Sequence, residues 1–114
     1  MSASDGGVIA EIAAERRRQV DAEGWTPDHD DEHNNGEIAR AAACYARAGA
    51  ESDPEMRRRL TDPYENFRFT PLREMWPWGW NWFKATDRRR DLVKAGALIV
   101  AEIERLDRKE KANG

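Results

Sequence analysis

A stretch near the end of the chain, residues 87–108, contains no proline and a single glycine. Its apolar residues recur at alternating spacings of four and three, which is the period of an amphipathic helix. These positions are Leu92, Gly96, Ile99, Ile103 and Leu106, and Val93, Ala97 and Val100 widen the apolar arc. At about 1.5 Å per residue such a helix is roughly 33 Å long. An arc this wide usually contacts more than one neighbour, so we expect core packing and consider a second subunit as one neighbour.

Helical periodicity also covers residues 7–22, where apolar residues gather on one side and charged residues lie elsewhere. Ser4 or Asp5 is suited to cap this segment, and Gly24 is suited to end it. The sequence therefore predicts a first helix from about residue 7 to residue 22.

Two more helices are predicted in the middle of the chain. One begins near Asn34 or Asn35, where Glu37 has the spacing of a capping box, and ends at Gly49. The other is short: Asp53 caps it, proline at the next position starts it, and it ends near Leu60.

The remaining segments are predicted to be irregular. Residues 24–36 are rich in turn-forming types, and residues 61–86 contain three prolines without a sustained period. The tail, residues 109–114, is expected to fray. We therefore expect one all-α domain over residues 1–114, with three to four helices around a core at 7–108, a long aromatic-rich crossover loop and assembly into an oligomeric helical bundle.

Composition limits the class of function. Nineteen basic against 22 acidic residues give a net charge of −3, which argues against non-specific nucleic-acid binding. The mean hydropathy of −0.93 and the lack of a long apolar run argue against a membrane protein. No secretory signal is visible at the N-terminus, and the single Cys44 fits a reducing compartment. We expect a soluble, cytoplasmic protein in which Cys44 is structural.

Two groups of acidic residues suggest metal chemistry. Residues 28–33, DHDDEH, are followed closely by Glu37. Carboxylates suit Mg²⁺ or Mn²⁺, whereas His29 and His33 would suit Zn²⁺ if helical; the alternative is a solvated acidic loop before a helix. The second group is Asp87, Asp91 and Lys94, which share one face of the last helix and suit either a metal with a phosphate or a plain ion pair.

An aromatic block spans residues 75–83, in which Trp76, Trp78, Trp80 and Trp82 alternate with other residues. Stacked indoles can hold a nucleobase. Bulky rings can equally anchor a long crossover in a small domain, and we favour this packing role for most of them.

Three arginine triplets, at residues 16–18, 57–59 and 88–90, complete the charged features. Guanidinium groups suit phosphate oxygens, but three consecutive helical residues point in different directions. We expect solvated charge with local pairing for most of these arginines and consider one inward side chain in each triplet.

Four blocks of the sequence resemble small, mostly uncharacterised proteins encoded by tailed phages and prophages: EGWTPDHDDEH, GEIARAAACYARA, WPWGWNWFK and DRRRDLVKAGALIVAEIERLDR. This resemblance covers roughly residues 8–108. It implies a bacterial host cell as the location and carries no established activity.

A more distant resemblance is to the all-α nucleoside-triphosphate pyrophosphohydrolases of the MazG type. These enzymes hold Mg²⁺ between acidic residues of two packed helices and cleave between the α- and β-phosphates. Residues 36–41, GEIARA, are similar to their first acidic motif at Glu37, and Asp91 is similar to the second. At two further positions where the family has an acidic residue, this chain has Arg40 and Arg88. Glu15 and Asp31 would therefore have to complete the set of metal ligands.

The leading hypothesis from this resemblance is a nucleotide-handling, Mg²⁺- or Mn²⁺-dependent pyrophosphohydrolase. Its metal ligands would be Glu15, Asp31, Glu37 and Asp91. Its nucleotide contacts would be Lys94, Arg90, Trp25, Trp78 and Trp80. The alternative is a non-catalytic anti-defence protein that sequesters a nucleotide signal or a host protein.

Overall fold

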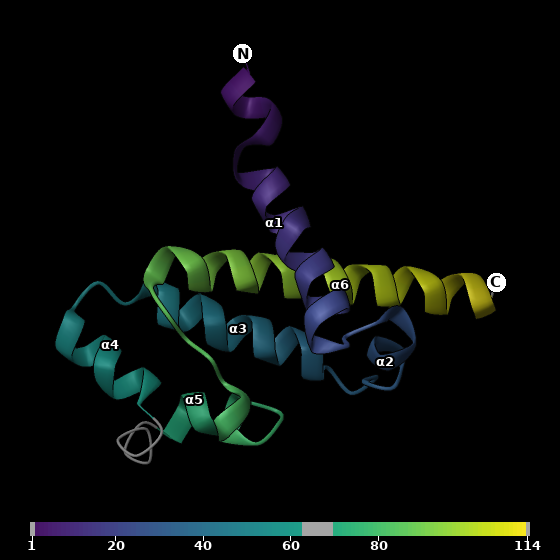
Figure 1. Cartoon of the computed structure of the whole chain (residues 1–114). Coiled ribbons are helices and arrows are strands. Elements are labelled where there is room, and N and C mark those ends of the chain that lie inside the picture. Colours follow the sequence, from purple (N-terminus) through teal and green to yellow (C-terminus); the bar gives the residue numbers. More distant parts are fainter. Residues whose placement is uncertain (1, 63–69, 114) are drawn as a thin grey trace.

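The computed structural model describes residues 2–62 and 70–113, and within them all regular structure is helical (Figure 1). The longest element, α6 (Arg88–Asn113), runs antiparallel to α3 (Glu37–Ala50), and these two helices form the most extensive contact in the molecule. Small side chains explain how closely the two approach, because α3 contributes fully buried Ala41 and Ala48 to this interface. At Gly49 an added Cβ would lie 2.6 Å from Cγ of Leu92, so only glycine fits there.

The first helix, α1 (Ser2–Glu23), crosses α6, and its N-terminal half extends away from the rest of the molecule (Figure 1). The helical geometry is interrupted at Gly7, which agrees with the predicted start there. The predicted capping side chains of Ser4 and Asp5 lie outside the described side chains. Ile12 packs onto Gly96 of α6.

The structure corrects the prediction of a continuous loop over residues 24–36. Helix α2 (Pro27–Asp31) forms there, with the Thr26 hydroxyl accepting a hydrogen bond from the His29 amide at 3.2 Å. Proline at the first helical position needs no amide hydrogen bond, so Pro27 starts this helix. A cap followed by proline also begins α4 (Pro54–Thr61), where the Asp53 side chain accepts a hydrogen bond from the Glu55 amide, and this helix start was predicted.

Residues 61–86 are also more regular than predicted. They contain α5 (Thr70–Met75) and a single 3₁₀ turn, η2 (Trp80–Trp82), while Pro63 and its neighbours to residue 69 lie outside the described residues. The described part thus has six α-helices instead of three or four, because the additional helices are too short to show a period in the sequence. Helix α6 continues to Asn113, where fraying was predicted from Lys109. No described helix combines the length and apolar character needed to cross a membrane.

Packing between α3 and the crossover is largely aromatic. Trp76 and Trp80 are buried against Phe83, and Tyr45 of α3 contacts Trp76 and Phe83 with ring centroids 5.7 and 4.9 Å away. These rings hold the crossover in place. The packing role predicted for most of the tryptophans is therefore confirmed for two of them.

Candidate functional site: an aromatic pocket beside a buried lysine

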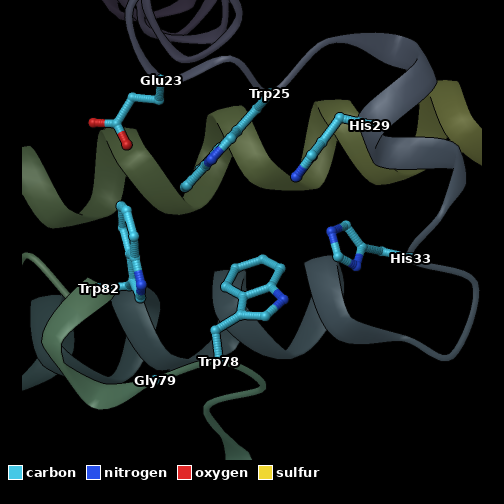
Figure 2. Close-up of a pocket in the computed structure, with 7 residues that line it drawn as sticks. All are labelled: Glu23, Trp25, His29, His33, Trp78, Gly79 and Trp82. Carbon is cyan, nitrogen blue, oxygen red and sulfur yellow. The ribbon is translucent and has the colours of Figure 1, made fainter.

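A pocket of about 470 Å³ opens between the end of α1, α2 and the crossover (Figure 2). Its described lining is Glu23, Trp25, His29, His33, Trp78, Gly79 and Trp82. Three indole rings from two distant segments of the chain thus face one cavity. We call this cavity the Trp pocket.

Local backbone structure places these rings. Gly24 has φ of 73°, which glycine adopts readily, and it ends α1 so that the Trp25 amide donates to the Gln19 carbonyl at 3.0 Å. On the other side, the η2 turn directs Trp80 into the core and leaves Trp82 half exposed beside the cavity.

Ring contacts fix part of the wall. Trp78 lies 6.0 Å from Trp25 and 5.3 Å from His33, measured between ring centroids. Figure 2 shows Trp82 standing on the opposite side of the opening from His33. The three indoles and the two imidazoles thus surround the pocket.

Two buried nitrogen atoms of the pocket lack a hydrogen-bond partner: Nδ1 of His29 and Nε2 of His33. The two imidazoles lie edge to face with centroids 4.8 Å apart. Buried polar atoms usually have partners, so these two nitrogens are unusual; Oδ1 of Asp30 lies 3.8 Å from Nδ1 of His29, which is too far for a hydrogen bond.

A second, smaller cavity of about 30 Å³ adjoins the Trp pocket and shares Glu23, Trp25 and Trp82 with it. Its other lining residues are Glu15, Arg18, Gln19, Tyr45, Lys84 and Lys94. We call it the polar cavity. Arg18, Lys84 and Lys94 are cationic, and Glu15 and Glu23 are anionic, so positive charge is in excess.

The carboxylate of Glu15 is buried in this cavity and fully engaged. Arg18 donates to both of its oxygens at 2.9 Å, and Arg90 donates to Oε1. Burial works to raise the pKa of Glu15, but the hydrogen bonds and charges of Arg18 and Arg90 outweigh it and lower the pKa below its usual value. Glu15 is therefore an ionised partner for arginines.

Lys94 is a buried cation on which the charges of Asp91 and Glu15 act only from a distance. It is 9% exposed, and no carboxylate of the described residues lies within 4 Å of its ammonium. It donates to the Lys84 carbonyl at 2.6 Å and lies 5.6 Å from the centre of the Tyr45 ring. Burial lowers the pKa of Lys94. Nearby Oε1 of Gln19, which is 2% exposed, has no partner either.

The four predicted metal ligands do not come together. Asp91 is fully buried and accepts from Arg57 at 2.6 Å and from the Thr86 amide at 2.9 Å. The same Arg57 binds the Ala48 carbonyl near the end of α3, whereas Glu37 starts that helix, roughly 16 Å away at about 1.5 Å per residue.

The other two predicted ligands are held elsewhere. Asp31 pairs at the surface with Arg108, and Glu15 is held by the two arginines described above. Glu37 itself accepts from the Asn35 amide at 2.7 Å. Over residues 2–62 and 70–113, no group of three or more His, Cys, Asp or Glu side chains is arranged to hold a metal ion.

The predicted nucleotide contacts are divided. Trp25 and Trp78 line the Trp pocket, and Lys94 lines the polar cavity. Arg90 lines neither of these two cavities and donates a hydrogen bond to Glu15 instead. Trp80 lies in the core, stacked on Phe83 at 4.6 Å. Trp80 was predicted to contact a nucleotide, but Trp82 is the residue that lines the Trp pocket. The sequence prediction also missed Gln19 and Lys84, since neither has a local motif.

Besides Arg18, which binds Glu15, each arginine triplet has one side chain that pairs with a buried carboxylate. These are Arg16, which binds Asp30 at 2.8 Å, Arg57, which binds Asp91, and Arg90, which binds Glu15. Their partners are carboxylates of this chain. Cys44 is also structural: it is buried, and burial raises its pKa to about 12, so its thiol is unreactive.

No protein-family model, no curated protein and no solved structure matches this chain. The resemblances drawn from its sequence motifs remain predictions.

Proposed function

We propose that this protein binds a small molecule of the nucleotide class in the Trp pocket and holds it without hydrolysis. The observation that carries the proposal is the meeting of Trp25, Trp78 and Trp82 around one open cavity of about 470 Å³. This volume lies in the range of about 300–1,000 Å³ that small-molecule pockets occupy. Indoles stack on any flat heteroaromatic ring, and each such stack contributes about 1–3 kcal/mol.

The polar groups around the cavity support a ligand that is both heteroaromatic and anionic. The imidazoles of His29 and His33 line the cavity and suit contact with the edge of such a ring. The excess positive charge of Lys84 and Lys94 in the adjoining polar cavity suits an acidic group such as phosphate. The polar cavity, at about 30 Å³, has room for only about two water molecules, so we expect a phosphate group to lie outside it.

The engagement of the carboxylates supports binding without turnover. Asp91 and Glu15 are held by arginines; Glu37 begins α3, whereas Asp91 of α6 is joined through Arg57 to Ala48 near the other end of α3. Such an arrangement suits a protein that sequesters a nucleotide, which is the alternative drawn from the sequence.

The test is a calorimetric and tryptophan-fluorescence titration of the purified protein with nucleoside monophosphates, cyclic nucleotides and the matching nucleosides. We expect binding, quenching of indole fluorescence and weaker binding of the nucleosides, which lack phosphate. Trp82→Ala should weaken binding about 5- to 150-fold, because about 1–3 kcal/mol of stacking is lost and 1.4 kcal/mol equals a factor of ten.

A matched control is Leu106→Ala, because Leu106 is 49% exposed, close to the 51% of Trp82, and lies outside both cavities. This control should bind as the wild type does. No binding by any member of the panel, or equal loss in both variants, would refute the proposal. Release of pyrophosphate from a triphosphate with Mg²⁺ would instead favour the hydrolase predicted from the sequence.

A further inference from the structure

Helix α6 has two apolar faces, and only one of them is covered. The inner face contains Ala97, Leu98 and Ala101, which are at most 2% exposed. On the outer face, large apolar side chains stand about half exposed: Leu92 (48%), Ile99 (50%), Ile103 (53%) and Leu106 (49%). We call these four residues the outer stripe. Isolated exposed apolar residues are common, but a continuous stripe of this kind marks an interaction surface.

Neighbouring elements extend the apolar surface. Ala39, Ala43 and Ala46 of α3 line a groove of about 230 Å³ together with Ile99 and Ile103. Across α6, beyond Ile12 and its contact with Gly96, α1 carries Val8 and Ile9, which are 55% and 79% exposed. The stripe thus lies between α3 and the N-terminal half of α1, which extends outward (Figure 1).

The two ends of the outer stripe are symmetric about Ile99, whereas the position that mirrors Ile103 is the buried Ala95. Leu92 and Leu106 lie seven residues to either side of it, and the exposed Arg88 and Glu110 lie eleven residues to either side. When two copies of α6 pair antiparallel with Ile99 at the twofold axis, each Leu92 meets the partner's Leu106. Each Arg88, whose Nε also donates to the Gly49 carbonyl of its own chain at 2.9 Å, then lies opposite the partner's Glu110, so opposite charges meet at both ends of the helix pair. A parallel pair would bring like charges together at each end.

We propose that this protein forms a twofold symmetric homodimer through the outer stripe, with the two α6 helices antiparallel and centred on Ile99. The spacing of four and three along the stripe is that of a helix pair with interlocking side chains. This seam is about 33 Å long and about 10–12 Å wide, so each copy covers roughly 350–400 Å². Val8, Ile9 and the alanines of α3 extend the buried total toward the lower limit of specific interfaces, about 1,200 Å² for two copies. The dimer should therefore dissociate in the micromolar range.

The dimer leaves the ligand site free. Lys94 precedes Ile99 by five residues, which places the two about 140° apart around α6 at about 3.6 residues per turn. Dimerisation and ligand binding consequently use different sides of the helix. A failure of one proposal leaves the other standing.

The test uses light scattering behind size exclusion, followed by cysteine cross-linking. The wild type should approach twice the 13.1 kDa chain mass as its concentration rises through the micromolar range, and Ile99→Glu should stay monomeric with unchanged helix content. Ile99→Cys should form a disulfide-linked dimer under mild oxidation. Asp21→Cys, at an exposed position of α1 away from the stripe, is the control and should not.

Orientation is tested with Leu92→Cys and Leu106→Cys. A mixture of the two variants should cross-link to each other, and each alone should cross-link much less. Cross-linking of each variant with itself would refute the antiparallel arrangement. A wild type that remains monomeric at all concentrations, or an Ile99→Glu variant that still dimerises, would refute the interface.

Discussion

The arrangement of Asp91 offers a sharp test of what this carboxylate does, since the sequence suggested a metal ligand and the structure shows a buried ion pair. Replacing Asp91 by Asn keeps the shape and removes the charge. Arg57 and the Thr86 amide both donate to the carboxylate, but a carboxamide has one acceptor oxygen, so one of these donors would meet an NH₂ group.

The expected loss of stability follows from these contacts. A hydrogen bond to a charged group contributes about 1.5–3 kcal/mol, and a buried donor left without a partner destabilises by about 1–3 kcal/mol. Arg57 keeps its bonds to the Ala48 and Thr86 carbonyls, so we expect a total near the lower end, about 3 kcal/mol. For a domain of this size that lowers Tm by about 10–12 °C.

The assay is thermal and urea unfolding followed by circular dichroism, with and without Mg²⁺. Asp31→Asn is the matched control, because Asp31 was also predicted to bind metal but pairs with Arg108 at the surface, where ion pairs contribute little. The control should melt close to the wild type. If the two variants lose equal stability, or if Mg²⁺ stabilises the wild type and neither variant, the structural interpretation of Asp91 fails.

Three further predictions concern buried groups. Lys94→Met should raise stability at neutral pH, because burial lowers the pKa of Lys94 and the charged form destabilises the fold below that pKa. This difference in unfolding free energy should shrink as the pH rises toward the pKa of an unfolded lysine, and urea unfolding from pH 7 to pH 10.5 measures it. A difference that stays constant or grows over this range would contradict the prediction. Cys44 should resist a thiol-specific reagent at pH 8 in the folded protein and react once urea unfolds it; prompt reaction in the folded state would contradict its burial. Gly49→Ala should destabilise by about 1–3 kcal/mol through its clash with Leu92, and Leu92→Ala in the same chain should recover part of that loss in a double-mutant cycle.

Sequence periodicity located the long helices but not the short ones. The all-α class and the helices now seen as α1, α3, α4 and α6 were accessible because each has an apolar period or a clear cap. Helix α2 has only five residues, so its single signal was Thr26 before Pro27, the same cap-and-proline pair that correctly located α4 at Asp53. Elements of five or six residues contain too few turns for a period to be visible.

The site was less accessible because ion pairs and ring contacts join distant parts of the chain. Glu15 and Arg90 are 75 residues apart, so the sequence could not show that an arginine holds this predicted metal ligand. The alternation of the tryptophans did not show which of them are buried, because this depends on the η2 turn: Trp80 enters the core and Trp82 borders the pocket. Trp25 and Trp78 were identified as residue types suited to stacking, and only the fold brings them together at 6.0 Å.

Polar atoms without partners point to the same place as the indoles. The described part has four buried side-chain nitrogen or oxygen atoms without a partner, and three of them, Oε1 of Gln19, Nδ1 of His29 and Nε2 of His33, belong to residues that line the two cavities. Each such atom lowers stability unless water or a ligand pairs with it. Lys94 adds a buried charge at the same location, whereas the charges of Asp91 and Asp30 are compensated by arginines. If these groups bind a ligand, replacing Lys94 by Met should lower the affinity for that ligand and raise the free energy of unfolding. A lysine with a purely structural role would lower stability when replaced.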